Sequence, residues 1–307
     1  MMYATPLVSV SMSVYNNERY LREALESILT QSFTDFEFLI INDGSTDQSL
    51  NILQEYAAQD QRIRLSSREN RGIPKTRNEM LAQAKGEFIA VMDADDVALP
   101  ERFARQVEFL QAHPEVVCVG GAFERIDEKG RFLDRCEPPQ TDAEIQPILL
   151  GGMSFLHHPC TMVRRAAMLA VGGYDESMIG SSDLDLWLRL SEIGQLANLP
   201  DLVLRYRMHL NSLTYRKKSR QSLDAQAACE RAWQRRGIQG EFVREANDFM
   251  RQHEFLLRCG WGGFNRGERD MAIDCGLKAI TVQPFALESW KLFVCALIKP
   301  MPKSSNL

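Results

Sequence analysis

The segment Phe88-Ile89-Ala90-Val91-Met92-Asp93-Ala94-Asp95-Asp96 joins an uninterrupted apolar run to three carboxylates. A short apolar run that ends in a polar turn is typical of a buried strand in a parallel sheet. Ligands of open α/β sheets bind beyond the carboxyl ends of such strands, where crowded carboxylates suit Mg²⁺ or Mn²⁺ with a phosphate. The segment therefore predicts a metal-assisted nucleotide enzyme, with an acidic turn that caps the next helix as the simpler alternative.

Before this segment, strand patterns alternate with helix patterns. Apolar and β-branched runs at residues 7–14, 36–41 and 63–66 predict three further strands, each followed by a polar turn and a helix. This alternation predicts an α/β fold with a mostly parallel, Rossmann-like sheet covered on both faces by helices. Because the polar turns all follow strands, we expect them to gather on one edge of the sheet.

After the segment the pattern is looser. Pro100 suits the first turn of a helix that ends at His113-Pro114, and a loop is expected over residues 134–141. An acceptor site could be inserted there. A further helix over residues 183–193 and a short strand over residues 202–208 complete the expected domain.

Beyond about residue 211 the pattern consists of helices alone, expected at residues 216–236, 241–258, 267–282 and 285–299. This change divides the chain into a first domain of residues 1–212 and a helical C-terminal region of residues 213–307. The helical region carries 16 Lys+Arg against 10 Asp+Glu, whereas the first domain carries 20 against 31. A basic tail favours contact with an anionic membrane surface, although a solvated helix surface explains the charge more simply.

The last expected helix has an apolar stripe beside Lys291 and Lys299. Packing of this stripe onto the first domain is the leading interpretation, and a homodimer or docking on a membrane surface are the alternatives.

Composition excludes several classes of protein. The first residues lack the pattern of a signal peptide, and no apolar run reaches the roughly 18 residues of a membrane span. We therefore expect a cytoplasmic protein, at most peripheral at the inner face of the membrane. The seven cysteines are scattered, which indicates buried thiols rather than disulfides or a zinc site. The acidic first domain argues against nucleic-acid binding, and the first strand is not followed by a dinucleotide-binding glycine motif.

Other polar residues follow the expected strands. Asp43, in Asn42-Asp43-Gly44-Ser45, could accept the N3–H of uracil or thymine, and Tyr15 could stack on the base, although a tight turn explains the motif equally well. Arg71 and Arg77 could meet a diphosphate, or form surface salt bridges. Asp183 could be a general base or a helix cap.

Taken in order, the motifs resemble those of the inverting family 2 glycosyltransferases, which have the GT-A fold. The resemblance covers residues 6 to about 212. It rests on Val8-Ser9-Val10 with Tyr15-Asn16, Asn42-Asp43-Gly44-Ser45-x-Asp47, Asn70-Arg71-Gly72 with Arg77-Asn78, Asp93-Ala94-Asp95-Asp96, Gly172-Gly173-Tyr174-Asp175, Asp183-x-Asp185-Leu186-Trp187-Leu188-Arg189 and Tyr206-Arg207-x-His209.

The resemblance implies the roles of single residues. Asp183 would be the catalytic base, and Asp95 and His209 would hold Mn²⁺ or Mg²⁺ against the leaving diphosphate. A nucleotide diphospho-sugar donor would be bound by Tyr15, Asp43, Arg71, Arg77, Asp93 and Ala94. The family usually has an acidic residue before the base, where this chain has Ser182, and this departure puts the acceptor in doubt more than the reaction.

The resemblance therefore implies transfer of a sugar, most simply from a UDP-sugar, to a glycan or lipid-linked acceptor in cell-envelope polysaccharide synthesis. A nucleotidyltransferase is disfavoured because Tyr15-Asn16-Asn17-Glu18 stands where a Gly-rich basic phosphate loop would be needed. The non-enzymatic alternative is a decayed sugar-nucleotide-binding or scaffold protein that acts through its helical tail.

Overall fold

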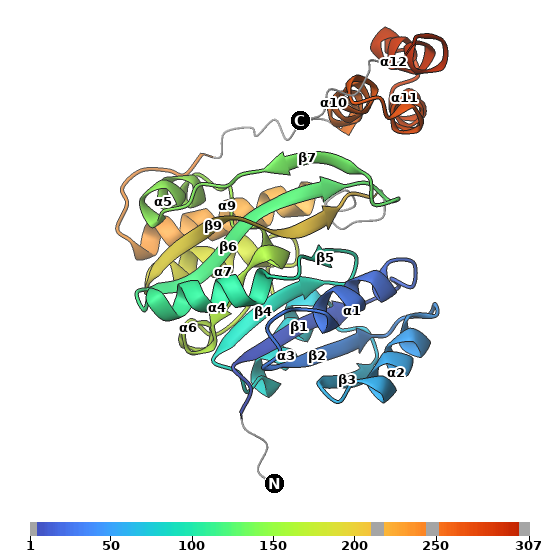
Figure 1. Ribbon diagram of the computed structural model, residues 1–307. Helices are drawn as coiled ribbons and strands as arrows, with labels where there is room; N and C mark the ends of the chain where they lie inside the picture. Colours follow the sequence, from blue (N-terminus) through green and yellow to red (C-terminus); the bar gives the residue numbers. More distant parts are fainter. Residues whose placement is uncertain (1–4, 210–217, 244–251, 301–307) are drawn as a thin grey trace. The chain divides into compact units, whose positions relative to one another are not determined.

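The chain forms two compact units in the computed structural model, which describes residues 5–209, 218–243 and 252–300 (Figure 1). Unit 1 comprises residues 1–124 and 135–244, and unit 2 comprises residues 125–134 and 245–307. No helix of the described residues is both long and apolar enough to cross a bilayer.

Unit 1 is built on one mixed sheet, with the strand order β3-β2-β1-β4-β8-β6-β9-β5 and β7 paired to β6. The first four strands in this order are parallel, whereas β8 pairs antiparallel with both β4 and β6, and β5 pairs antiparallel with β9. The mostly parallel α/β fold expected from the sequence is therefore confirmed. The strands are β1 (Val8–Val14), β2 (Phe36–Asp43), β3 (Ile63–Arg68), β4 (Phe88–Asp93), β5 (Val97–Ala98), β6 (Val116–Ile126), β7 (Phe132–Cys136), β8 (Met162–Arg164) and β9 (Gln195–Arg207).

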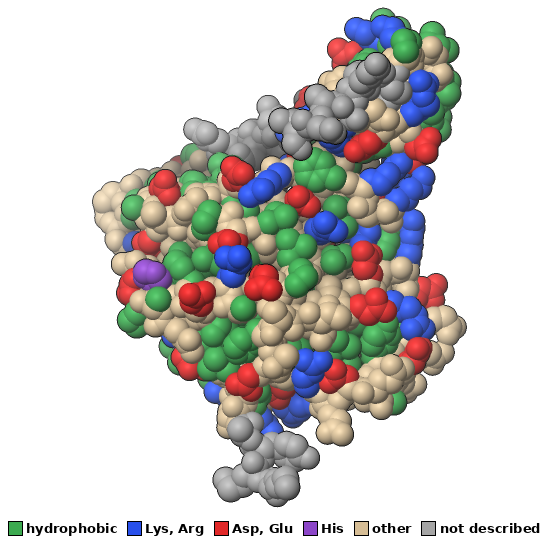
Figure 2. Space-filling model, viewed as in Figure 1, with side chains coloured by type: hydrophobic (Ala, Val, Ile, Leu, Met, Phe, Trp, Pro, Cys, Tyr) green, Lys and Arg blue, Asp and Glu red, His purple; other side chains and the backbone are tan. Residues whose placement is uncertain are grey.

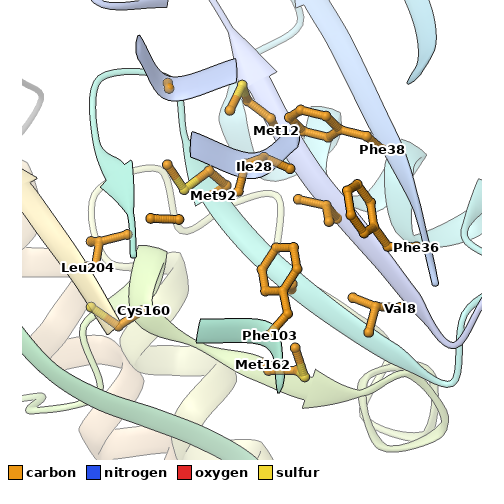
Figure 3. Close-up of a cluster of buried hydrophobic side chains, with 14 of the residues drawn as sticks. Val8, Met12, Ile28, Phe36, Phe38, Met92, Phe103, Cys160, Met162 and Leu204 are labelled. Atoms are coloured by element: carbon orange, nitrogen blue, oxygen red, sulfur yellow. The ribbon is translucent and has the colours of Figure 1, made fainter. Parts of the chain in front are cut away.

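Helices cover both faces of this sheet, so it has two hydrophobic cores. On one face α1 (Leu21–Leu29), α2 (Ser49–Gln59) and α4 (Arg102–Ala112) pack on Val10, Phe38 and other side chains of the same parity. Figure 3 shows part of this core, with Phe36, Phe103 and Met162 among its members. On the other face, side chains of opposite parity such as Leu39 and Ile89 pack on the remaining helices of unit 1. These helices are α3 (Ile73–Gln83), α5 (Asp142–Leu150), α6 (Arg165–Ala170), α7 (Ser182–Leu190) and α9 (Lys218–Arg235).

The antiparallel part of the sheet differs most from the expectation. The loop expected over residues 134–141 begins inside β7, which pairs with β6, and α5 follows it. The strand expected over residues 202–208 is the second half of β9, which begins at Gln195. Local patterns do not reveal these strands clearly, because β7 is short and mixes apolar with charged residues, and β9 pairs with β5, which lies far earlier in the chain.

Unit 2 contains α10 (Gln252–Asn265), α11 (Arg269–Val282) and α12 (Leu287–Ile298), together with the tip of the β6–β7 hairpin. The helix expected over residues 241–258 lies partly outside the described residues, and α10 continues past Gly260. A Cβ on Gly260 would lie 2.4 Å from Leu292 Cδ2, so the glycine permits close helix packing instead of ending the helix.

The boundary expected at residue 212 is not where the structure divides the chain. Helix α9 lies in unit 1, because its buried face, with Ala225, Ala228 and Cys229, joins the core that contains Trp187 of α7. The basic charge is divided as well. Residues 213–244 carry 8 Lys+Arg against 3 Asp+Glu, whereas residues 245–307 carry 8 against 7. Most of the basic excess of the tail therefore belongs to the part around α9.

Candidate active site

The strand register brings the expected polar turns to one edge of the sheet. Val14 pairs with Asn42, Ser13 pairs with Asp93, and Asp43 pairs with Arg68. Tyr15, one residue beyond β1, is 54% exposed at this edge. The carboxyl ends of β1, β2, β3 and β4 thus form one polar surface, as in other open α/β sheets.

Asp43 is a buried carboxylate at this edge, at 3% exposure. Its Oδ1 accepts the backbone N–H of Arg71 at 2.9 Å and forms an ion pair with Arg68, while its Oδ2 accepts the N–H of Gly72 at 3.1 Å. Sequence reasoning missed Arg68, although its place at the end of β3 puts it opposite Asp43 in the sheet. The carboxylate is held rigidly, and Oδ2 keeps a lone pair for one more donor.

The two arginines expected near a diphosphate differ in their surroundings. Arg71 is half exposed, and its guanidinium pairs with Glu79 at 3.0 Å. Arg77 is largely buried, and its Nη2 lies 3.2 Å from Asp93 Oδ1. Only Arg77 is therefore brought to the acidic turn, whereas Arg71 contributes its backbone N–H to the enclosure of Asp43.

The acidic turn after β4 concentrates negative charge. Burial raises the pKa of Asp93, the charges of Asp95 and Asp183 add to the rise, and Arg77 opposes it. Asp96 is fully buried, and burial, with the charges of Asp95 and Asp93, raises its pKa well above the usual range. Such a turn is suited to a cation, because a cation would relieve this repulsion.

The structure brings together the two expected metal ligands, which are far apart in the sequence. His209 Nε2 lies 2.8 Å from Asp95 Oδ2. Adjacent ligands of an octahedral ion, each at about 2.1 Å, are separated by about 3 Å, so this spacing fits Mg²⁺ or Mn²⁺. Among residues 5–209, 218–243 and 252–300, no three His, Cys, Asp or Glu side chains form a metal-binding group. An ion here would therefore need further oxygen ligands, such as those of a bound phosphate.

Arg207, two residues before His209, holds the turn that contains Asp95 and Asp96. Its backbone N–H donates to Asp96 Oδ1 at 2.8 Å, and its Nε–H donates to the carbonyl oxygen of Asp95 at 2.9 Å. The guanidinium also pairs with Glu23 and lies 4.7 Å from the centre of the Tyr20 ring. No local pattern indicated this role, because Arg207 ends β9 whereas its partners lie in α1, just before α1 and in the turn after β4.

A second pair of carboxylates lies at the start of α7. Asp183 is partly exposed, and its Oδ1 accepts the N–H of Leu184 at 2.9 Å. Asp185 is buried and pairs with Arg189, with 2.6 Å between Oδ2 and Nη2. Ser182, in the place of the usual acidic residue, is also buried. Asp183 is therefore the carboxylate at this helix start that remains available to a substrate.

Tyr174, in the Gly172-Gly173-Tyr174-Asp175 motif, lies behind both acidic groups. Its hydroxyl is 2.9 Å from His158 Nε2, and the Arg77 guanidinium lies 5.5 Å from the centre of its ring. Burial raises the pKa of Tyr174, and the charges of Asp183 and Asp93 add to this rise, while Arg77 opposes it. Both carboxylates are thus within electrostatic reach of one buried ring. The motif supports Arg77 and does not itself form a binding loop.

The chain is similar to several known proteins in sequence and in fold. The family model described as "Glycosyl transferase family 2" matches residues 9–172. The amylovoran biosynthesis glycosyltransferase AmsE of Erwinia amylovora is 32% identical over 206 residues, which cover 66% of this chain and 76% of AmsE.

Two solved structures share the fold. The fragment 1–349 of TarS from S. aureus, in complex with UDP-GlcNAc, has a TM-score of 0.60 at 18% identity and covers 94% of this chain and 88% of that one. The mannosyltransferase PcManGT from Pyrobaculum calidifontis, in complex with GDP-Man and Mn²⁺, has a TM-score of 0.55 at 17% identity and covers 97% and 82%.

Proposed function

This chain belongs to glycosyl transferase family 2, and we propose that it transfers a sugar from a nucleotide diphospho-sugar to an acceptor hydroxyl with inversion at the anomeric carbon. The observation that carries the proposal is the contact between Asp95 and His209, which are 114 residues apart in the chain. The contact follows Asp93 at the carboxyl edge of the sheet, and the charge of Asp183 contributes to the raised pKa of Asp93.

The donor is proposed to bind along β1, β2 and β4. Tyr15 offers an exposed ring for stacking beneath the base, and the free lone pair of Asp43 Oδ2 can accept the N3–H of uracil. The backbone N–H groups of Arg71 and Gly72 hold this carboxylate in place. Arg77, Asp93 and Ala94 would lie along the ribose and the diphosphate. We favour a UDP-sugar, and the solved TarS complex with UDP-GlcNAc supports such a donor.

Asp95 and His209 are proposed to hold Mn²⁺ or Mg²⁺, and the solved PcManGT complex with Mn²⁺ supports this choice. Such an ion would offset the negative charge that develops on the leaving diphosphate. Arg207 keeps the Asp95 carbonyl in place, so the ligand turn is already organised before the donor binds.

Asp183 is proposed as the general base. Its carboxylate takes the proton of the acceptor hydroxyl, and the resulting oxygen forms a bond to the anomeric carbon. The bond from that carbon to the diphosphate breaks on the opposite side, and this single displacement inverts the configuration. Because Ser182 stands where the family usually has an acidic residue, Asp183 has no carboxylate directly before it in the chain.

We propose that the acceptor is a glycan or a lipid-linked saccharide in polysaccharide synthesis, and the name of the relative AmsE supports this class. No observation favours the alternative of a decayed scaffold protein.

Donor binding tests the proposal directly. Calorimetry with UDP, GDP, dTDP and CDP, with and without Mn²⁺, should show metal-dependent binding of one nucleotide. Asp95→Asn should abolish the metal dependence, whereas the matched control Asp201→Asn, at an exposed ion pair with Arg105, should keep it. If the folded protein bound none of the four nucleotides, the assignment would be refuted.

Peripheral membrane contact is proposed through α12 of unit 2. Phe285, Leu287 and Ile298 are exposed, with Phe285 at 97%. Figure 2 shows hydrophobic side chains beside Lys and Arg on the visible face of this unit. Within the part of the chain that the structure describes, neither Lys291 nor Lys299 forms a salt bridge. An apolar stripe flanked by free ammonium groups is complementary to an anionic bilayer.

Co-sedimentation with phosphatidylcholine vesicles, with and without phosphatidylglycerol, tests this surface. Phe285→Ser with Leu287→Ser should abolish binding to the anionic vesicles, whereas Leu223→Ser, at an exposed leucine of α9, should not. A homodimer that dissociates in the double variant, without any vesicle binding, would show instead that a second copy covers the stripe.

A further inference from the structure

The loop that leads to Asp183 is held by a helix that follows it by more than thirty residues. Four hydrogen bonds join this loop, residues 175–181, to α9. Arg231 Nη1 donates to Asp175 Oδ2 at 2.9 Å, and Arg220 Nη2 donates to the Ser177 carbonyl at 3.3 Å. The Gly180 N–H donates to Asp224 Oδ2 at 2.7 Å, and Ser181 Oγ donates to the Gln221 carbonyl at 2.9 Å.

Asp224 is the buried member of this contact, at 5% exposure. Its second oxygen, Oδ1, pairs with Arg220 Nε at 2.9 Å, so both oxygens of the carboxylate are engaged. A hydrogen bond from a backbone N–H to an ionised carboxylate is stronger than one between neutral groups. The bond from the Gly180 N–H, three residues before Asp183, is therefore strengthened by charge, and it ends on a buried carboxylate, whereas the Arg231–Asp175 pair is more exposed.

Gly180 allows the two backbones to touch. A Cβ at this position would lie 2.8 Å from both Cα and N of Gln221. These are backbone atoms of a helix and cannot move aside without moving α9. The φ of Gly180 is outside the left-handed region, so close approach, and not backbone conformation, requires glycine here.

The start of α7 depends on this contact because it lacks a cap of its own. Ser181 is the N-cap residue, but its side chain makes no capping bond to α7 and donates to α9 instead. The turn that presents Asp183 is therefore positioned from outside, while α7 and α9 share a core below it.

We propose that Asp224 is a positioning residue for the transfer reaction, and that it acts through Gly180 to set the place of the Asp183 carboxylate. This inference rests on the proposed function, because it takes Asp183 as the base. A displacement of about 1 Å in a catalytic group can reduce a rate by about 100-fold. Donor binding should be spared, because Tyr15, Asp43, Asp93 and Asp95 lie on β1, β2 and β4.

Three variants test the proposal. Asp224→Ala and Gly180→Ala should each lower kcat by about 10- to 100-fold. Asp224→Asn keeps an oxygen that can accept the Gly180 N–H, so it should retain most of the activity. Gly151→Ala is the matched control, because its Cβ would make ordinary contacts of 3.4 Å with the carbonyls of Ile148 and Pro147. UDP release from UDP-glucose, UDP-galactose and UDP-N-acetylglucosamine with Mn²⁺ reports turnover, and calorimetry with UDP reports donor-site affinity.

A second readout does not need turnover. Amide hydrogen exchange over residues 175–181, followed by mass spectrometry, should become faster in Asp224→Ala and stay as in the wild type in Asp224→Asn. Normal kcat and exchange in Asp224→Ala would overturn the inference. An equal loss of UDP affinity and kcat, or unfolding of Asp224→Asn, would also overturn it, because α9 would then serve general stability.

The two proposals fail in distinguishable ways. Normal turnover of Asp183→Asn would refute the base assignment itself. Loss of turnover in Asp183→Asn, together with normal turnover in Asp224→Ala and Gly180→Ala, would leave the base assigned and remove only the role of α9.

Discussion

The acidic turn after β4 and the acidic start of α7 have similar compositions but are held differently. In the turn, Asp95 meets His209 while Asp96 is buried against the backbone of Arg207. In the helix, Asp183 is partly exposed while Asp185 is buried against Arg189. Each region thus has one carboxylate that no arginine fixes. Arginines hold the other two carboxylates of the turn, Asp93 and Asp96, and the other carboxylate of the helix, Asp185.

The difference lies in the backbone between the carboxylates. The three carboxylates of the turn are crowded together, and burial with mutual repulsion raises the pKa of Asp93 and Asp96. Asp183 and Asp185 are two residues apart on a helix, so their side chains point about 200° apart. A crowded set is suited to sharing a cation, whereas a separated pair can divide its work between catalysis and stability.

The largest effect should come from the exposed helix carboxylate. Asp183→Asn removes the proton acceptor, so we expect kcat to fall by about 10³-fold with UDP affinity unchanged. UDP release and calorimetry measure the two quantities. If Asp185→Asn lost kcat as severely while remaining folded, the division of work between the two residues would be wrong.

Next in size is the effect of the buried helix carboxylate on stability. Asp185→Ala leaves the Arg189 guanidinium largely buried without its partner, which should lower the free energy of unfolding by about 3 kcal/mol. Urea denaturation measures this loss. The double variant Asp185→Leu with Arg189→Met should recover most of it, because an apolar pair leaves no buried charge. No recovery would indicate that the pair does more than neutralise charge.

A substitution in the turn after β4 should change the Mn²⁺-dependent binding of UDP. Asp95→Asn should weaken Mn²⁺-dependent UDP binding by at least about tenfold, since even indirect partners of metal ligands contribute that much. Titration of Mn²⁺ at fixed UDP measures the change. An unchanged Mn²⁺ dependence would place the ion elsewhere and remove the contrast between the two regions.

The smallest effect is expected on the pH dependence of stability, at His158, whose ring lies against the Tyr174 hydroxyl. Burial, and then the charge of Arg77, lower its pKa well below the usual value. Well above pH 6.5 the imidazole is neutral in both the folded and the unfolded chain. As the pH falls below that value only the unfolded chain gains a proton, so stability should fall by up to about 1.4 kcal/mol per pH unit.

Urea denaturation between pH 6.5 and 5 tests this slope. His158→Gln should flatten it, and His113→Gln, at an exposed imidazole, should not. An unchanged slope in His158→Gln would show that other groups account for the pH dependence.

The sequence predicted well those parts whose signals are local. Strand β1 alternates apolar residues with Ser, β2 and β4 are mostly apolar, and α11 and α12 have clear helical periodicity, so their positions were close to those observed. Strand β7 has no such signal because it is short and mixes apolar with charged residues, and the pairing of β6 with β8 has none because β7 and α5 lie between them in the chain. The end of α10 was missed because Gly260 reads as a helix breaker, whereas it serves close packing against Leu292.

In the site, too, some residues have a local sequence signal and others do not. Asp43, Asp95 and Asp183 stand out because each follows a recognisable element, although their roles stay predictions. Their supports do not stand out. Arg68 does not stand out in the sequence, and Arg207 stands out only as a member of the Tyr206-Arg207-x-His209 motif; the contacts of both arginines appear only when separate segments are aligned.

The tip of the β6–β7 hairpin, residues 125–134 of unit 2, affects the order in which the units finish folding during synthesis. Its charges pair with residues made much later, since Asp134 meets Arg258 and Lys129 meets Asp274, 124 and 145 residues further along the chain. At about 5 to 20 residues per second, the ribosome needs roughly 6 to 30 seconds to supply those partners. Until then the tip is hydrated. Unit 2 is therefore completed last, from a hairpin tip made early and from α10, α11 and α12 made late.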